Sequence, residues 1–134
     1  MAIVSSGELA LAGDDDVVLC RQAVRRLTVE LGFSLVGQTK MVTAASELAR
    51  NTVIYGGHGV LKWQTLSEGP RRGLRLSFED RGPGIADLKL ALTDGWSSGH
   101  GLGLGLTGAR RLVNEFELDS TVGVGTRVTV TRWK

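Results

Sequence analysis

The sequence is poor in cysteine and in long apolar runs, and each scarcity excludes a class of protein. Cys20 is the single cysteine of the 134-residue chain, so neither an internal disulfide nor a cysteine-based metal cluster can form. No apolar run approaches the roughly 20 residues of a membrane span. The first ten residues, MAIVSSGELA, also lack the basic start and apolar stretch of a signal peptide. These absences predict a cytoplasmic protein with no membrane partner and with Cys20 on the buried side of a helix.

Neither sign of charge dominates the chain, which holds 16 Lys and Arg against 14 Asp and Glu, a formal net charge of +2. The arginine pairs at 25–26, 71–72 and 110–111 are scattered rather than massed, which argues against a nucleic-acid partner. A hydrophobic content of 42% in a chain of this length fits one globular domain over residues 1–134.

Glycine, by contrast, is abundant and unevenly spread, with six between positions 95 and 108. Such a segment must either move or bring its backbone close to another group. It is not a Walker loop, because no Gly-Lys-Ser/Thr ends it, and it is not a dinucleotide fingerprint, because no strand directly precedes it. Two interpretations stay open at this point: a mobile lid, and an anion cradle before the next helix.

Periodicity and turn residues predict alternating helices and strands. Strands are expected at 7–13, 60–66 and 73–80, and two more within 118–133, joined around Gly123 and Gly125; helices are expected at 14–32, 36–56, 86–92 and 106–116. This order predicts an α/β two-layer sandwich, in which helices cover one face of a single mixed, mostly antiparallel sheet.

The second expected helix carries a carboxylate and an amide near each other. Glu47 and Asn51 are four residues apart, so about 40° around the axis and roughly 6 Å along it separate them. Both lie at the border of the apolar stripe, where the edge of a cleft would hold them half-buried. A solvated flank is the plain alternative, but a carboxylate and an amide oxygen at one pocket edge suit a hydroxyl and a hard cation respectively.

Strand alternation places a second carboxylate toward the core. Asp80 continues the inward series of Leu74, Leu76 and Phe78, and an inward charge needs a donor from the protein or from a ligand. A structural turn cap is the alternative. Thr126 shares the parity of the inward valines of the last strand, so its hydroxyl is expected to point into the same interior.

Four short stretches in this order, ELARN, DRGPG, GLGLGL and GVGT, resemble the N, G1, G2 and G3 boxes of the Bergerat-fold (GHKL) ATP-binding superfamily. Within that superfamily the chain most resembles the small serine/threonine kinases of bacterial partner-switching systems, in particular stressosome switch kinases of the RsbT type. The resemblance covers nearly the whole chain and implies the Bergerat fold, with ATP and Mg²⁺ as cofactors.

The resemblance also implies roles for individual residues. Glu47 is expected to act as the catalytic base, Asn51 to bind the magnesium ion, and Asp80, with Thr126 nearby, to accept a hydrogen bond from the adenine amino group. Gly82 and Gly84 would let the backbone pass close to the nucleotide. The lid and phosphate-binding turn would comprise Gly101, Leu102, Gly103, Leu104, Gly105 and Leu106. The glycine-rich segment would therefore be a lid whose closed form is a cradle.

The partners expected from this resemblance are STAS-domain proteins of a stressosome-like complex, as substrates, and a PP2C-type phosphatase that the released kinase activates in a stress or sigma-factor pathway. One alternative is an anti-sigma factor kinase of the RsbW or sporulation type that sequesters a sigma factor. A nucleotide-dependent binding module without transfer is another. A histidine kinase is disfavoured, because neither His58 nor His100 lies on a dimerising helical domain.

Overall fold

The structure, a computed structural model, describes residues 1–85 and 106–134. In chain order the elements are β1 (Ala2–Leu11), α1 (Asp14–Glu30), α2 (Leu35–Tyr55), β2 (Gly59–Glu68), β3 (Arg71–Asp80), α4 (Leu106–Arg111), β4 (Glu115–Thr121) and β5 (Gly125–Trp133). The helix expected at 86–92 lies outside the described residues. No helix in those two described ranges is long and apolar enough to cross a membrane.

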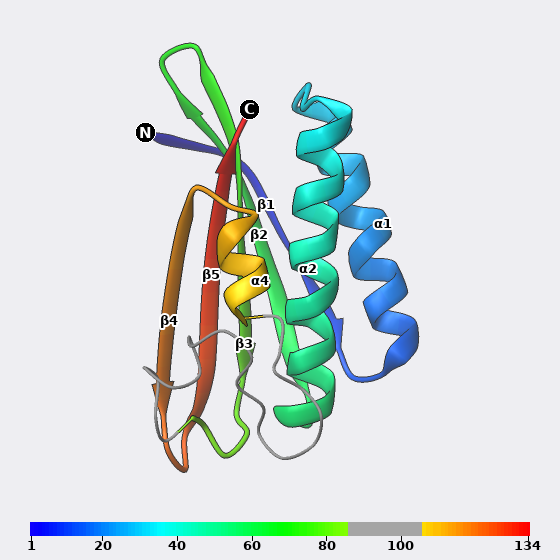
Figure 1. Ribbon diagram of the computed structural model, residues 1–134, viewed down its shortest axis with the longest axis vertical. Helices are drawn as coiled ribbons and strands as arrows, with labels where there is room; N and C mark the ends of the chain where they lie inside the picture. Colours follow the sequence, from blue (N-terminus) through cyan, green and yellow to red (C-terminus); the bar gives the residue numbers. More distant parts are fainter. Residues whose placement is uncertain (86–105) are drawn as a thin grey trace.

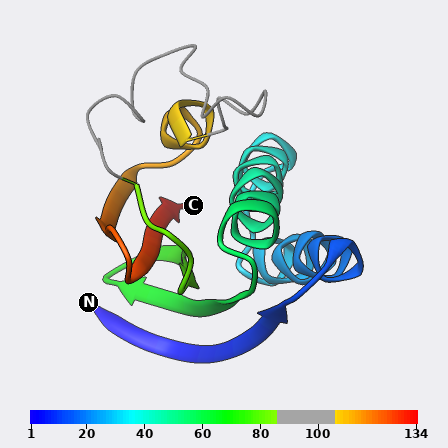
Figure 2. The same cartoon turned by 90° about the horizontal axis from the view of Figure 1, so that it is seen from below.

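The strands form one five-stranded sheet in the order β1-β2-β3-β5-β4, and every neighbouring pair is antiparallel. The helices α1, α2 and α4 all lie on one side of this curved sheet (Figures 1 and 2). The other face of the sheet carries no helix among the described elements. The expected two-layer α/β sandwich is confirmed.

The core lies between the helices and the sheet. Alternation along β3 turns Leu74, Leu76 and Phe78 toward the helices, where each is almost fully buried. From the helical side, α2 contributes Met41 and Leu48, which are at most 1% exposed. Burying each such side chain contributes roughly 1.5–3 kcal/mol, so this seam fixes α2 over the centre of the sheet.

Cys20 lies on the buried side of α1, as expected, and is fully excluded from solvent. Burial raises the pKa of its thiol to about 12. The thiol is therefore protonated at neutral pH and behaves as a small apolar side chain of the core.

Two element boundaries differ from the expectation. The helix predicted to reach Phe116 ends at Arg111, and Phe116 lies in β4 instead. The reason is a long-range anchor, because the Asn114 amide donates to the Thr131 carbonyl at 2.9 Å and its side-chain oxygen accepts from the Trp133 amide at 2.7 Å. Strand β1 also begins at Ala2 rather than at residue 7, since it pairs with β2 from Gly59 to Ser67.

Candidate functional site

Asp80, the last residue of β3, points toward the helical side of the sheet and is half-buried. Its Oδ1 atom accepts hydrogen bonds from the backbone amides of Gly82, at 2.8 Å, and Thr126, at 3.3 Å. Over residues 1–85 and 106–134, no hydrogen bond to Oδ2 is found. One oxygen therefore stabilises the turn, as the structural alternative expects, and the expected contact of the other oxygen with a ligand stays a prediction.

Glycines bring three backbone segments against Asp80. At Gly56, which ends α2, a Cβ atom would lie 2.4 Å from the Asp80 Cβ and Cγ atoms. At Gly125, which begins β5, it would lie 2.1 Å from the Asp80 carbonyl oxygen. At Gly82 it would lie 2.8 Å from the Gly56 Cα atom. Any side chain at these positions would push the end of α2 or the start of β5 away from the carboxylate.

Gly84 has a different constraint, because its φ of 77° is a left-handed conformation that favours glycine. A Cβ atom there would also lie 2.4 Å from the Thr121 carbonyl oxygen. Close approach of Gly82 and Gly84 to neighbouring backbone is therefore a property of the fold itself. Their expected approach to a nucleotide stays a prediction.

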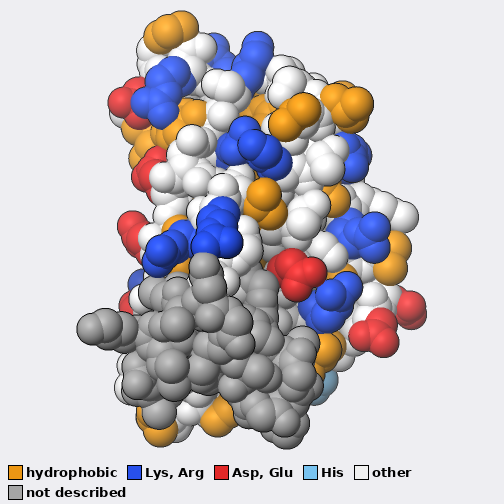
Figure 3. Space-filling model, in the orientation of Figure 1, with side chains coloured by type: hydrophobic (Ala, Val, Ile, Leu, Met, Phe, Trp, Pro, Cys, Tyr) orange, Lys and Arg blue, Asp and Glu red, His pale blue; other side chains and the backbone are white. Residues whose placement is uncertain are grey.

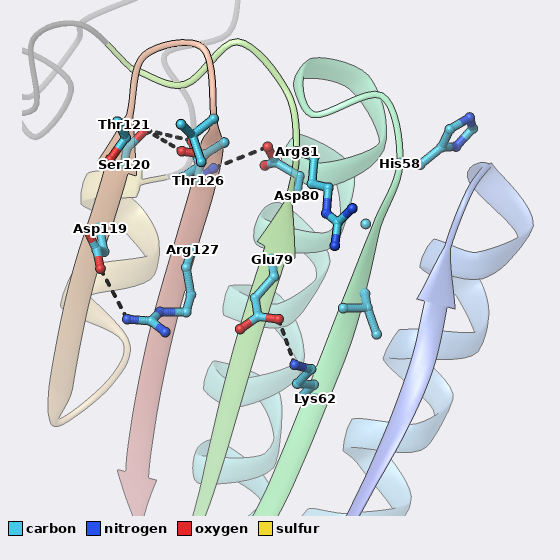
Figure 4. A pocket seen from close by; sticks show the side chains of 14 residues that line it. His58, Lys62, Glu79, Asp80, Arg81, Asp119, Ser120, Thr121, Thr126 and Arg127 are labelled. Carbon is cyan, nitrogen blue, oxygen red and sulfur yellow. Dashed lines mark hydrogen bonds and ion pairs between the residues drawn. The ribbon is translucent and has the colours of Figure 1, made fainter.

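Hydroxyl groups on β4 and β5 continue the polar edge that Asp80 begins (Figure 4). Thr126 pairs with Asp80 in the β3–β5 register and with Ser120 in the β4–β5 register. The Ser120 and Thr126 hydroxyl oxygens are 2.8 Å apart, and the Ile85 amide donates to the Ser120 oxygen at 2.8 Å. Thr126 was expected here from the sequence, but Ser120 was not. The alternation of Phe116, Leu118 and Ser120 along β4 was the available signal.

Glu47 and Asn51 lie on α2, and both are half-buried, as expected. The helix begins at the cap Ser34, whose side chain accepts from the Gly37 amide, and it ends against Asp80 at Gly56. At 1.5 Å per residue, Asn51 lies about 7 Å and Glu47 about 13 Å along the axis from Gly56. Along the axis of α2 the order is therefore Glu47, Asn51 and then the helix end that meets Asp80.

The Glu47 side chain is 39% exposed and accepts from Arg50 Nη1 at 3.4 Å, a long contact between partly solvated groups. Such a pair is worth little in stability. The carboxylate is thus within reach of a group on another protein, which a deeply buried base would not be.

The chemistry of these groups suits an elongated ligand with a hydrogen-bond donor at one end and anionic groups at the other. Asp80 Oδ2 is an acceptor, whereas the Asn51 amide oxygen is a neutral ligand of the kind that Mg²⁺ accepts. In the described part of the chain, no three His, Cys, Asp or Glu side chains come together to hold a metal ion. An ion beside Asn51 would therefore need further oxygen ligands, from water or from the bound molecule.

The expected phosphate-binding turn is only partly described. Gly101, Leu102, Gly103, Leu104 and Gly105 lie outside the described residues. Leu106 begins α4, and its side chain is 6% exposed and belongs to the core. Its side chain is therefore structural, so the expected phosphate contact depends on its backbone amide.

A hollow of about 700 Å³ lies over the ends of β3, β4 and β5, and its lining includes Asp80, Ser120 and Thr126 as well as charged residues of the open face. Figure 4 shows its charged side chains in front of the strands, with the helices behind. Lys62 pairs with Glu79 at 2.9 Å and Arg127 with Asp119 at 3.1 Å. The hydrogen bond to Glu79, followed by its charge, raises the pKa of Lys62. Lys62, Glu79, Arg127 and Asp119 form a row of charges across the open face, which the sequence did not predict. The opposite charges in this row neutralise each other in solvent.

The helical side has a different charge pattern. Figure 3 views the molecule from this side, and more Lys and Arg than Asp and Glu side chains lie over the helices. The exposed cations of α1, α2 and α4 are Arg21, Arg26, Lys40, Arg50, Arg110 and Arg111. Beyond the acidic first turn of α1, the acids of these helices are Glu30 and Glu47. Beyond the first turn of α1, exposed basic side chains therefore outnumber acidic ones on these three helices.

Comparison with known proteins identifies two similar sequences. Over 118 residues the chain is 42% identical to the serine/threonine-protein kinase RsbT of Bacillus subtilis (strain 168), an alignment that covers 88% of this chain and 89% of that protein. It is 31% identical over 115 residues to the anti-sigma F factor of Clostridium novyi (strain NT), covering 81% of this chain and 79% of that one.

Solved structures and protein families give the same result. The crystal structure of the RsbU and RsbW domains of a Mycobacterium tuberculosis protein superposes with a TM-score of 0.68 at 21% identity, which shows the fold. The match covers 98% of this chain and only 33% of that longer one. Residues 37–134 match the family of histidine kinase-, DNA gyrase B- and HSP90-like ATPases. They include every candidate residue described above, and this chain belongs to that family.

Proposed function

We propose that this protein is an ATP- and Mg²⁺-dependent protein serine/threonine kinase of a partner-switching system. The observation that carries the proposal is Asp80, a core-facing carboxylate whose Oδ1 atom is held by two backbone amides, beside the end of the helix that bears Asn51 and Glu47. The 42% identity to a serine/threonine-protein kinase over most of both chains supports it.

At the base-binding end, Asp80 Oδ2 accepts a hydrogen bond from the adenine amino group. Its Oδ1 atom is held by the Gly82 and Thr126 amides, so the carboxylate is already oriented before the nucleotide arrives. Orientation in advance lowers the entropy lost on binding. Thr126 lies beside it and completes the polar edge.

At the phosphate end, Asn51 holds the magnesium ion, which neutralises phosphate charge when bound. Phosphoryl transfer has a loose transition state, so the residues act by positioning and by charge stabilisation. The backbone from Gly101 to Leu106 binds the phosphates. Glu47 accepts the proton of the incoming serine or threonine hydroxyl. Its 39% exposure permits a protein side chain to reach it.

The acceptors are STAS-domain proteins of a stressosome-like complex in the cytoplasm, and release from that complex lets the kinase activate a PP2C-type phosphatase. The excess of exposed basic side chains over the helices supports a protein partner with an acidic surface, since complementary charge steers association. A second candidate function is that of an anti-sigma factor that sequesters a sigma factor. The 31% identity to an anti-sigma F factor favours it.

Incubation of the purified protein with labelled ATP, Mg²⁺ and STAS-domain proteins tests the proposal, with label expected on a serine or threonine. Glu47→Ala should bind ATP normally but transfer phosphate on the order of 10²–10⁴ times more slowly, because the base is lost. Asn51→Ala should lose both Mg²⁺-dependent binding and transfer.

Glu30→Ala is the matched control, because Glu30 is an exposed glutamate of α1 and should leave transfer unchanged. Transfer at the native rate by Glu47→Ala would contradict the role of that residue. ATP binding without transfer, together with capture of a sigma factor, would favour the anti-sigma function.

A further inference from the structure

Ser120 has no part in the mechanism proposed above, yet its hydroxyl lies at the centre of the hydrogen bonds beside Asp80. It accepts from the Ile85 amide at 2.8 Å, donates to the Gly125 carbonyl at 3.1 Å and lies 2.8 Å from the Thr126 hydroxyl. The side chain is half-buried on β4, directly opposite Thr126 on β5. Three of the segments around the base-binding end thus meet at one oxygen.

Counting donors assigns the direction of the bond between the two hydroxyls. A serine hydroxyl has one proton and two lone pairs. The Ile85 amide can only donate and the Gly125 carbonyl can only accept, so the Ser120 proton goes to that carbonyl. The contact with Thr126 must therefore use the Thr126 proton. Every donor and acceptor of Ser120 is satisfied by this arrangement.

This bond direction determines what the Thr126 hydroxyl can offer to a ligand. Because its proton is committed to Ser120, the Thr126 hydroxyl presents only lone pairs elsewhere. Asp80 Oδ2 beside it is also an acceptor. Among the described residues, Thr126 and Asp80 thus offer acceptors to the base, a pattern that matches the N–H groups of an exocyclic amine.

We infer that Ser120 is a positioning residue, which fixes the Thr126 hydroxyl as an acceptor and thereby selects a purine nucleotide that bears a 6-amino group. The inference rests on the proposed nucleotide binding and deepens it. Without Ser120, the Thr126 hydroxyl is free to turn and to donate its proton instead. The site would then lose part of its preference for the amine while still binding the nucleotide.

Calorimetric titration of the whole protein with Mg²⁺-ATP and with Mg²⁺-purine riboside triphosphate tests this, because the second ligand differs from ATP only in lacking the 6-amino group. The measured quantity is the affinity for Mg²⁺-ATP divided by the affinity for Mg²⁺-purine riboside triphosphate. Ser120→Ala should lower this ratio about 3- to 10-fold, the value of one neutral hydrogen bond. Ser120→Thr keeps the hydroxyl and should restore the native ratio to within about twofold.

Ser77→Ala is a matched control. Ser77 and Thr129 form another cross-strand hydroxyl pair at 2.8 Å, on β3 and β5, but on the open face of the sheet. Its loss should leave the affinity ratio unchanged. If Ser120→Ala does not fold, Ser120→Cys keeps the size of the side chain with a much weaker hydrogen-bonding group, and should lower the ratio in the same direction.

A double-mutant cycle separates positioning from simple destabilisation. Thr126→Val should lower the ratio by itself, and adding Ser120→Ala to it should lower the ratio no further, because Ser120 acts through Thr126. Additive effects, or a native ratio in a folded Ser120→Ala or Ser120→Cys variant that binds ATP, would overturn the inference and leave the proposed function intact. Absence of ATP binding by the unmodified protein would instead overturn the proposed function.

Discussion

The ends of β3, β4 and β5 present two different surfaces that are built from neighbouring residues. On the open face, Glu79, Asp119 and Arg127 belong to a row of ion pairs in contact with solvent. Each of these residues has a chain neighbour on the helical face: Asp80, Ser120 and Thr126. These three residues are joined by hydrogen bonds, and Asp80 packs against the end of α2. Alternation along the strands alone separates the two sets.

Their difference shows which polar groups indicate function. Exposed ion pairs such as Arg127 and Asp119 are 53% and 69% exposed, gain little from each other and lose little if removed. A carboxylate that faces the core is costly, yet Asp80 is held there with one oxygen uncommitted among the described residues. Residues of both faces line the hollow, but Asp80 on the helical face is the one with an oxygen atom left to accept from a ligand.

The largest effect is expected from Asp80→Asn. The amide oxygen can still accept from the Gly82 and Thr126 amides, so the turn is preserved, but an NH₂ group replaces the open Oδ2 atom. A donor would then face the donor of the adenine amine, and ATP affinity should fall by about 100-fold or more. Calorimetric titration with ATP measures this loss.

Glu79→Gln gives the matched control, because the same change is made one residue earlier on the opposite face. It removes the charge that pairs with Lys62 and should leave ATP affinity within about twofold of the native value. An equal loss of ATP affinity in Asp80→Asn and Glu79→Gln would mean that the two faces of the sheet do not differ in nucleotide binding.

A smaller effect, on stability rather than affinity, is expected from Gly125→Ala. Gly125 has a φ of 147°, and a Cβ atom would lie 2.1 Å from the Asp80 carbonyl oxygen. The added methyl group should lower the free energy of unfolding by about 1–3 kcal/mol through backbone strain and overpacking. Urea denaturation measures the change.

Gly108→Ala makes the same substitution where nothing lies within 4 Å of the new Cβ atom, on the helix α4. It should raise the free energy of unfolding by about 0.5–1 kcal/mol, because alanine is the better helix former. If Gly108→Ala lowered the free energy of unfolding as much as Gly125→Ala, the close approach to Asp80 would not be the reason for glycine at position 125.

Local periodicity was sufficient to predict most of the helical face. The inward placement of Asp80 and Thr126 follows from alternation within their own strands, and the half-buried position of Asn51 and Glu47 follows from the helical repeat of α2. None of these predictions required knowledge of a distant contact. Their assigned roles in binding and catalysis remain proposals that the variants above test.

What the sequence did not predict depends on contacts between distant segments. Residues 106–116 have helical spacing throughout, but pairing of Asn114 with β5 ends the helix early and starts β4. Alternation along β4 could have placed Ser120 on the helical face, but its pairing with Thr126 is known only once β4 and β5 are in register. The row of charges on the open face likewise exists only through the register of four strands.

The smallest effect is expected on the open face itself. A double-mutant cycle with Arg127→Ala and Asp119→Ala should give a coupling energy of about 0.2–1 kcal/mol that shrinks as salt is added, because both side chains are largely exposed. ATP affinity should not change in any variant of the cycle. If either single variant weakened ATP binding more than about tenfold, the open-face side of the hollow would contribute to the site, since Arg127 adjoins Thr126 and Asp119 adjoins Ser120 in the chain.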